Sequence, residues 1–520
     1  MCNMQLLKWQ RECLDIWQKN GFRGIVNAVT GSGKTFLALS AVRLLETHSV
    51  NPLKIKIVVP QTFLALQWKE DIKRVLHVPS SDIGVYFGKR KDRGRKFLIY
   101  VINSARYSMA RDIISELGGG NAILLIADEC HHYGSAENNK IFDFYRLLEE
   151  KSAYYSLGLS ATPDIVDMRS ISIPLGREIY AYDLECALRD RIISRFILFS
   201  ISLNFTKNEL AQYEQLSAEL HKSLHSLRRE NPELRDMTSG IFFARLHGIA
   251  KSFGESAQLA QNVLTLIYNR RTLCHMASER LRCAVDIVVS QPNTARMILF
   301  CERISSAGQL FAAINELFPE QVGLYHSQMA DNSRKLMLER YSNGALRILV
   351  CCRALDEGLN IPSTDVGIIV STSLSARQRV QRIGRMLRLS GEVKKIYFLY
   401  LAQSNEDAAL KMGLGTVANA VPLIGLRYFE GLFLHSEYTR LQDAVLGYVS
   451  SRRQDAAMLS DLDDNINLAL VRGDFLVKES VCLERINSGK SVSERNYWVS
   501  VLYVIYARKG KLRFDAQLGS

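Results

Sequence analysis

Short uninterrupted apolar runs, separated by longer stretches of helical periodicity, constrain this chain more than any other feature. In the first 195 residues the runs are Ile55 to Val59, Phe97 to Ile102, Ala122 to Ala127 and Tyr155 to Leu159. A second series begins near Met297 with MILFC, VGLYH, RILVCC, VGIIVST and IYFLYLA. Strands that are buried on both faces have this composition, and they occur in parallel sheets covered by helices. The pattern predicts an α/β fold with two similar parallel-sheet domains.

Two further segments have helical periodicity instead of short apolar runs. Leucine and tyrosine recur every three or four residues over 208 to 229, which predicts an amphipathic helix ended by Asn231-Pro232, and a second helical stretch follows at 256 to 289. We expect the strand series to stop near 416 and a mostly helical region to follow it. The predicted domains are a first sheet domain at 1–195, a linker strand and helical insertion at 196–290, a second sheet domain at 291–415 and a C-terminal accessory region at 416–520.

Composition excludes several classes of protein. The ten cysteines are scattered without a C-x-x-C pair, so neither a disulfide framework nor a zinc ribbon is expected. The chain has no apolar run of the length that spans a bilayer, and its start lacks the apolar segment of a signal peptide. We therefore expect a cytoplasmic protein. Lysine and arginine exceed aspartate and glutamate by 13 (66 minus 53), which favours a polyanionic partner.

A phosphate-binding loop is predicted at AVTGSGKT, residues 28 to 35, between a short strand at Gly24 to Asn27 and a helix. Glycines in such a turn let backbone N–H groups point at phosphate oxygens, and the start of the helix adds its positive dipole end. Lys34 would reach the β- and γ-phosphates, and Thr35 would supply a hydroxyl to Mg²⁺. The remaining loop residues expected to contact the nucleotide are Thr30, Gly31, Ser32 and Gly33.

The sequence ADECHH, residues 127 to 132, could belong to a metal site, a general acid/base centre or a nucleotide-hydrolysing carboxylate pair. An Asp-Glu pair at a strand end after a phosphate loop favours the last: Asp128 would hold the Mg²⁺ shell, and Glu129 would position and deprotonate the attacking water. Neighbouring side chains at a strand end point to opposite sides, and no third soft ligand has zinc spacing. His131 is interpreted as a hydrogen-bonding relay, and His132 as either a relay or a structural residue.

By its motifs and their order, the chain resembles superfamily 2 helicases and translocases of the DExH type. Beyond the loop and DECH, the matching stretches are VVPQTFLALQW (58–68), VINSA (101–105), LSATP (159–163), ILFCE (298–302), YHSQM (325–329), ALDEGLNIP (354–362) and QRVQRIGRMLR (378–388). The last two resemble XPB-like and restriction-subunit-like (ResIII) DNA translocases more than DEAD-box RNA helicases, although DECH also occurs in RNA-sensing helicases. The resemblance implies two tandem RecA-like lobes, with ATP and Mg²⁺ as cofactors, and by analogy a bacterial repair or defence enzyme.

The resemblance also implies roles for residues outside the phosphate loop. Ser160 and Thr162 would couple the nucleotide state to closure of the lobes. Arg385 and Arg388 would act as arginine fingers that neutralise transition-state charge across the cleft. Gln10 resembles the adenine-reading glutamine of the family, although a glutamine on a surface helix is also common. Further contacts to the nucleotide are expected from Asp356, Glu357, Gly358, Gln381 and Arg382.

A polymer can be moved only if each lobe grips it with an affinity that changes with the nucleotide. The candidates for backbone contacts, which carry no sequence specificity, are Gln61, Thr62, Asn103, Ser104, Ser327 and Thr372. A separate run, KRKDRGRK at 89–96, carries six basic residues in eight. A solvated turn between strands is its default interpretation, and contact with a duplex backbone is the alternative.

The sequence predicts an ATP-dependent helicase or translocase that acts on nucleic acid, with DNA favoured. Two alternatives remain open. One is a nucleic-acid-gated ATPase switch that signals to a partner protein through residues 416–520, where the aromatic residues Trp498, Tyr503 and Tyr506 form an interaction face or, more often in such runs, part of a core. The other is an RNA helicase, because no motif reports contact with 2′-hydroxyl groups.

Overall fold

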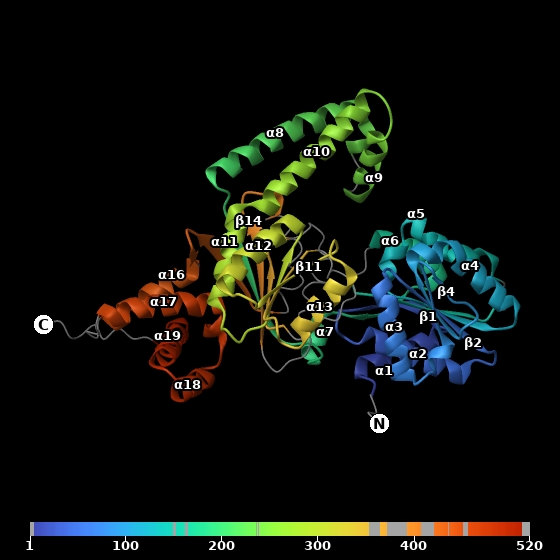
Figure 1. Cartoon of the computed structure of the whole chain (residues 1–520), viewed down its shortest axis with the longest axis horizontal. Helices are drawn as coiled ribbons and strands as arrows, with labels where there is room; N and C mark the ends of the chain where they lie inside the picture. Colours follow the sequence, from blue (N-terminus) through green and yellow to red (C-terminus); the bar gives the residue numbers. More distant parts are fainter. Residues whose placement is uncertain are drawn as a thin grey trace. The chain divides into compact units, whose positions relative to one another are not determined.

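The computed structural model describes residues 5–148, 152–161, 165–235, 237, 239–352, 364–371, 393–406, 421–434, 436–450 and 456–511. Among the described residues, one compact unit contains those up to Arg195, and a second contains those from Phe196 onward except Val393; they are here called the first unit and the second unit. Each unit is built around its own eight-stranded sheet. Figure 1 shows both units coloured along the chain.

The sheet of the first unit has the strand order β4-β3-β5-β2-β6-β7-β1-β8. Every described pair in it is parallel except β3 with β4. Its strands are β1 (Arg23–Ala28), β2 (Leu53–Val59), β3 (Ile83–Phe87), β4 (Arg90–Lys91), β5 (Phe97–Val101), β6 (Ala122–Ala127), β7 (Tyr154–Ser160) and β8 (Glu178–Tyr182). All residues of β5 and β6 are buried, as expected of strands covered on both faces. Because seven neighbouring strands run in parallel, the loops that follow them emerge at one edge of the sheet.

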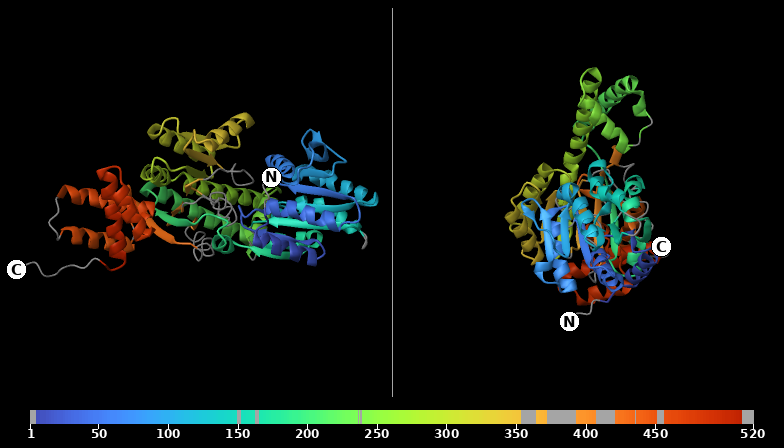
Figure 2. Two further views of the ribbon diagram at one scale, coloured as in Figure 1. Left: turned by 90° about the horizontal axis from the view of Figure 1, so that it is seen from below. Right: turned by 90° about the vertical axis from the view of Figure 1, so that its right-hand side faces the viewer.

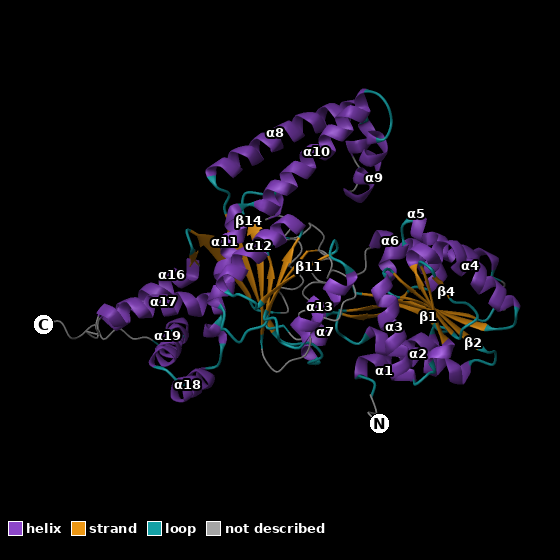
Figure 3. Ribbon diagram, viewed as in Figure 1, coloured by secondary structure: helices purple, strands orange, loops and turns teal. Residues whose placement is uncertain are grey.

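Helices cover both faces of this sheet (Figures 1 and 3). One layer contains α1 (Lys8–Lys19), α2 (Lys34–His48) and α3 (Thr62–Leu76), and the other contains α4 (Ile102–Gly118), α5 (Ala136–Asn139) and α6 (Ile165–Leu175). A short α7 (Leu184–Arg189) precedes the boundary between the units. The core under α4 and α6 includes Ile113, Leu125 and Leu175, which are fully buried.

The sheet of the second unit has the order β11-β12-β10-β13-β14-β9-β15-β16. Its pairs are parallel except β15 with β16. The strands are β9 (Phe196–Leu203), β10 (Met297–Cys301), β11 (Val322–His326), β12 (Ile348–Cys352), β13 (Val366–Ile369), β14 (Lys394–Leu401), β15 (Leu423–Phe429) and β16 (Leu432–Leu434). Three helices that pack beside this sheet are α11 (Ser278–Ser290), α12 (Ile304–Leu317) and α13 (Asp331–Ser342).

A helical arm projects from the second unit, as the right-hand view of Figure 2 shows. It consists of α8 (Lys207–Glu230), α9 (Ser239–Ala250) and α10 (Glu255–Met276). The arm has a small core of its own, in which Leu220, Leu227, Leu246 and Val263 are buried. Thr206 and Glu209 form a capping box at the start of α8, so two of the backbone N–H groups at this helix end are satisfied.

The C-terminal helices α16 (Ser436–Ser450), α17 (Ala456–Arg472), α18 (Glu479–Ser488) and α19 (Val492–Arg508) belong to the second unit. The hydroxyl of Tyr397 on β14 donates a hydrogen bond to the carbonyl of Val471 over 2.7 Å. Val501 and Val504 of α19 are fully buried in the same core as the sheet. Trp498 and Tyr503 pack against that core, so these two aromatic residues do not form a free interaction face.

The predicted fold class is confirmed, with two mostly parallel sheets, a helical insertion and a mostly helical C-terminal region. Three details of the prediction were wrong. The strand series continues past 416 with β15 and β16, Ile102 begins α4 instead of ending a strand, and β13 ends at Ile369. The helical stretch predicted at 256–289 is present and consists of two helices, because Ala277 between α10 and α11 has a non-helical ψ of 129°. Among the described helices, none is long and apolar enough to cross a membrane.

Candidate nucleotide site

The predicted phosphate loop joins β1 to α2 in the first unit. Gly31 and Gly33 have φ angles of 88° and 95°, a left-handed conformation that side chains disfavour. Gly33 is the N-cap of α2, so Lys34 is the first residue of the helix. The Thr30 hydroxyl oxygen is buried and has no hydrogen-bond partner among the described residues. This open turn at a helix start offers unused donors of the kind that bind phosphate.

Lys34 and Ser32 bond back to the strand end that precedes the loop. The Lys34 ammonium donates to the carbonyl of Ala28 over 2.8 Å, and the Ser32 hydroxyl donates to the carbonyl of Val29 over 2.7 Å. These two hydrogen bonds fix the backbone conformation of the turn. The Lys34 ammonium keeps further donors for an anion, because it has three N–H groups.

Gln10 lies against this loop although it comes 23 residues before Gly33. Its side-chain amide donates to the carbonyl of Gly33 over 3.1 Å, and its amide oxygen accepts from the backbone N–H of Leu7 over 3.0 Å. Gln10 is buried on α1. A Cβ atom at position 33 would lie 2.8 Å from the Gln10 amide nitrogen. Both this close contact and the positive φ angle therefore require glycine there. The glutamine therefore borders the candidate nucleotide site.

Asp128 follows β6 and is buried. One carboxylate oxygen accepts from the indole N–H of Trp68 on α3 over 2.8 Å, and the other accepts from the backbone N–H of Glu129 over 3.0 Å. Burial raises the pKa of the Asp128 carboxyl to about 6, and the charge of Glu129 adds to the rise, while Trp68 and the ammonium of Lys34 oppose it. The charge of Lys34 thus acts on the Asp128 carboxylate, and both residues follow parallel strands of the same sheet.

Glu129 adopts a left-handed backbone, with φ of 47°. A non-glycine residue in this region carries strain, which concentrates at functional sites. One of its carboxylate oxygens is buried without a hydrogen-bond partner in the described structure, 3.6 Å from Nδ1 of His131. That same Nδ1 lies 3.0 Å from the hydroxyl oxygen of Ser160 at the end of β7. The arrangement links Glu129 through His131 to Ser160, which is the kind of relay expected for His131. The ring of His132 lies against that of His131, with centroids 4.3 Å apart.

Two residues of this site were not assigned a role from the sequence. Trp68 holds the Asp128 carboxylate, and the Tyr133 hydroxyl lies 2.7 Å from the carbonyl oxygen of Asp128 and 3.1 Å from that of Val58. Both aromatic residues are buried. Helical periodicity could have marked Trp68 as buried, but nothing in the pattern indicates that its N–H faces a carboxylate.

The candidate nucleic-acid contacts of the first unit lie at the same sheet edge. Gln61 and Thr62 begin α3 after β2, and Asn103 and Ser104 begin α4 after the neighbouring strand β5. Gln61, Thr62 and Asn103 are exposed, and Ser104 is half-buried. Ser327 is exposed directly after β11 in the second unit. The other predicted site residues, Thr162, Asp356, Glu357, Gly358, Thr372, Gln381, Arg382, Arg385 and Arg388, lie outside the described residues.

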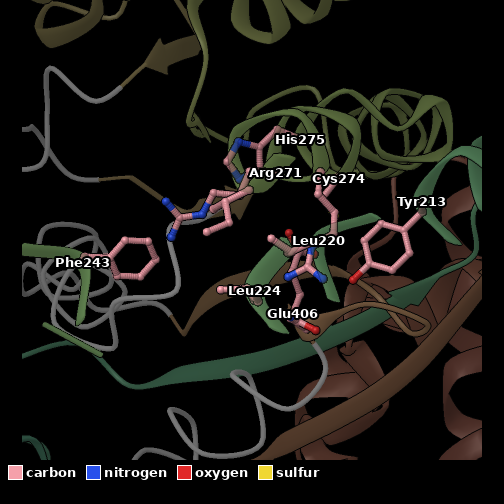
Figure 4. A pocket seen from close by; sticks show the side chains of 11 residues that line it. Tyr213, Leu220, Leu224, Phe243, Arg271, Cys274, His275 and Glu406 are labelled. Carbon is pink, nitrogen blue, oxygen red and sulfur yellow. The ribbon is translucent and has the colours of Figure 1, made fainter. Parts of the chain in front are cut away.

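A separate cavity of about 280 Å³ lies at the base of the helical arm (Figure 4). Tyr213, Arg271, His275 and Glu406 are among its lining residues. None of the residues predicted for the nucleotide or the nucleic acid lines it. The cavity belongs to the second unit and shares no residue with the candidate site on the first sheet.

A phosphate loop and an Asp-Glu pair at one edge of a parallel sheet define a nucleoside triphosphatase of the P-loop type. Two family models match the chain. The type III restriction enzyme, res subunit, matches residues 3–165, and the helicase conserved C-terminal domain matches residues 279–390. The chain belongs to the superfamily 2 helicases and translocases, and it has distant homologues of XPB and Rad25 type.

Individual relatives are similar over most of the chain. The DNA 3'-5' translocase XPB2 of Sulfurisphaera tokodaii is 26% identical over 388 residues, which are 74% of this chain and 79% of that protein. The structure of the helicase MrfA bound to DNA has a TM-score of 0.52 at 14% identity, covering 81% of this chain and 50% of that one. The structure of S. cerevisiae Dbp5 bound to RNA and ADP BeF3 has a TM-score of 0.50 at 13% identity, covering 82% and 90%. The structural likenesses show the fold, which is that of tandem RecA-like lobes.

Proposed function

We propose that this protein is an ATP-driven DNA translocase or helicase. The observation that carries the proposal is the common site of Lys34, Asp128 and Glu129 at one sheet edge, beside the exposed starts of α3 and α4. A nucleotide bound at this edge and a strand bound at the adjacent loops would be linked by β2, β6 and their neighbours. DNA is favoured because the relative XPB2 is a DNA translocase.

The residues of the site fit Mg²⁺-ATP. Magnesium prefers hard oxygen ligands, which the hydroxyl of Thr35 and the carboxylate of Asp128 would provide. The raised pKa of Asp128 indicates a buried negative charge that a bound cation would compensate. When bound, the metal ion would neutralise charge on the β- and γ-phosphates. The loop residues Thr30, Gly31, Ser32 and Gly33 would hold the phosphates, and Gln10 would contact the adenine.

In hydrolysis, Glu129 would accept the proton of the attacking water, and its oxygen without a hydrogen-bond partner is available for that water. His131 and Ser160, with Thr162, would report the nucleotide state to the strand-binding loops. Arg385 and Arg388 would complete the site as arginine fingers, with Asp356, Gly358, Gln381 and Arg382 as further nucleotide contacts. Gln61, Thr62, Asn103 and Ser104, with Ser327 and Thr372, would hold the strand backbone.

The proposal is tested by steady-state ATP hydrolysis with no polymer, single-strand DNA, duplex DNA and RNA. We expect DNA to stimulate hydrolysis, and Lys34→Ala to abolish it because the phosphates lose their lysine. A forked DNA duplex then separates strand displacement from translocation alone. A rate that no polymer changes would rule out a motor, and stimulation by RNA alone would identify an RNA helicase. Stimulation by DNA without movement along it would favour the ATPase switch, for which a protein partner at 416–520 would then be sought.

A further inference from the structure

The basic run at 89–96 folds as a hairpin and its following loop, at the far end of the first sheet. Lys91 and Arg90 of β4 pair with Tyr86 and Phe87 of β3. Three of the six basic side chains in the run are held by the first unit itself. Their contacts join Arg93 to the Tyr86 hydroxyl over 3.2 Å, Arg95 to the Ser81 carbonyl over 2.8 Å and Lys96 to the Glu46 carboxylate over 2.6 Å.

The other three basic side chains, Lys89, Arg90 and Lys91, are exposed. Lys89 and Arg90 make no side-chain hydrogen bond or ion pair within the part of the chain that the structure describes. The one acid of the run, Asp92, accepts a hydrogen bond from the backbone N–H of Val85 over 3.0 Å. The hairpin thus presents three cations while its carboxylate is engaged with its own backbone.

Lys91 is directed toward a candidate strand contact. Its ammonium donates to the Ser104 hydroxyl over 3.4 Å and lies 4.3 Å from the ring centroid of Tyr86. The topology explains this approach, because β3 pairs with β5 and β5 with β2, all in parallel. Adjacent strands lie about 4.8 Å apart, so the loops after β2, β5 and β3 follow one another over about 10 Å of the same edge.

An exposed aromatic residue lies on the helix that carries Ser104, the partner of Lys91. Tyr107 is 76% exposed and lies one turn after Asn103 and Ser104 on α4, with the exposed Arg111 one turn further. Residues three or four apart share a helix face, so Tyr107 and Arg111 extend the surface that begins at Ser104. Cations that bind a backbone, together with a ring on which a base stacks, are the usual elements of nucleic-acid surfaces without sequence specificity.

We propose that Lys89, Arg90 and Lys91 of the hairpin, with Tyr107 of α4, form an additional nucleic-acid contact, here called the hairpin surface. The inference rests on the proposed function, because it extends the strand path from the starts of α3 and α4 onto the last strands of the sheet. The three cations bind backbone phosphates next to those at Ser104, and Tyr107 stacks on an unpaired base. Sequence preference is not expected from such contacts.

The experiment measures the affinity of the full chain for a fluorescent DNA with a single-strand overhang across a series of salt concentrations. Each cation that binds a phosphate adds about 0.7 to 0.9 to the slope of log affinity against log salt. The double variant Arg90→Ala/Lys91→Ala is therefore expected to lower the slope by about 1.4 to 1.8. Lys96→Ala is the matched control from the same run, because its partner is Glu46, and its slope should equal that of the wild type.

Tyr107→Ala provides the second readout. Loss of stacking weakens binding about tenfold at every salt concentration, and it leaves the slope unchanged because no charge is removed. Arg90→Gln/Lys91→Gln repeats the charge removal with longer side chains in case the alanine variant fails to fold. Equal slopes for the wild type and the double variants would overturn the hairpin surface while leaving the proposed function intact. Absence of any binding by the wild type would instead contradict the proposed function.

Discussion

At the level of single residues, the candidate nucleotide site contains two carboxylates, Asp128 and Glu129, whose negative charges the surrounding protein does not fully neutralise. Asp128 is buried beside Glu129, and Glu129 has a strained backbone and a buried oxygen without a hydrogen-bond partner in the described structure. Trp68 and Lys34 compensate the Asp128 charge only in part, because its pKa is still raised to about 6. Buried carboxylates whose charge is only partly neutralised lower the stability of a fold. They are typical of sites where a bound ligand supplies the missing charge or hydrogen bond.

Asp128→Asn tests this cost. We expect it to abolish ATP hydrolysis and to raise the free energy of unfolding at pH 7.5, without divalent cations, on the order of 1 to 3 kcal/mol. The folded pKa of about 6 lies above the ordinary value of 3.8, so ionised Asp128 destabilises the fold above pH 6, and the cost falls as the pH drops toward 4. Thermal melts of both proteins between pH 4 and pH 8 measure the difference. A gap that stays constant over this range would show that the charge of Asp128 is not its cause.

Between elements, the first sheet contains a buried ion pair. Lys56 on β2 is fully buried, and its ammonium lies 2.7 Å from the carboxylate of Glu116 on α4. Burial lowers the pKa of Lys56, and the contact with Glu116 opposes this shift. The pair ties α4, which carries Asn103 and Ser104, to the strand that leads into Gln61.

Removal of the carboxylate should be costly because it leaves a buried ammonium without its counterion. We expect Glu116→Ala to lower the free energy of unfolding by about 3 to 5 kcal/mol, as measured by urea denaturation. Glu137→Ala is the control, because Glu137 pairs with Lys140 at the surface, where both side chains are about half exposed, and its loss should change little. Lys56→Met in the Glu116→Ala background should recover stability. Equal effects of the two glutamate substitutions would show that Lys56 does not depend on Glu116.

The strands and the loop were predictable from the sequence because buried parallel strands and glycine turns have local signatures. The run at 122–127, for example, coincides with β6. The β15–β16 hairpin was missed because its exposed positions include Leu423, Phe429 and Leu432, which hide the alternation of buried and exposed residues. Its signal was Glu430-Gly431, where both φ angles are positive, as a tight hairpin turn requires. The contact of Trp68 with Asp128 joins residues 60 positions apart, which no local pattern reports.

For the whole molecule, the central expectation is that arginines of the motif at 378–388 complete the nucleotide site that begins on the first sheet. Arg385→Ala in the full chain should leave ATP binding intact, because Lys34 and the phosphate loop bind the phosphates. It should lower the rate of DNA-stimulated hydrolysis by about 10³-fold or more, the effect typical of an arginine finger. Fluorescent-nucleotide titration and steady-state hydrolysis measure the two properties separately.

The comparison with two other variants decides where the arginine acts. Lys34→Ala should lose nucleotide binding together with hydrolysis, whereas Arg385→Ala should lose hydrolysis alone. Arg334→Ala is the control from the second unit, because Arg334 pairs with Asp331 within α13 and should affect neither property. If Arg385→Ala hydrolysed ATP at the wild-type rate, the residues at the edge of the first sheet would supply all the catalytic groups. Hydrolysis would then be coupled to the bound polymer without any contribution of Arg385 to the transition state.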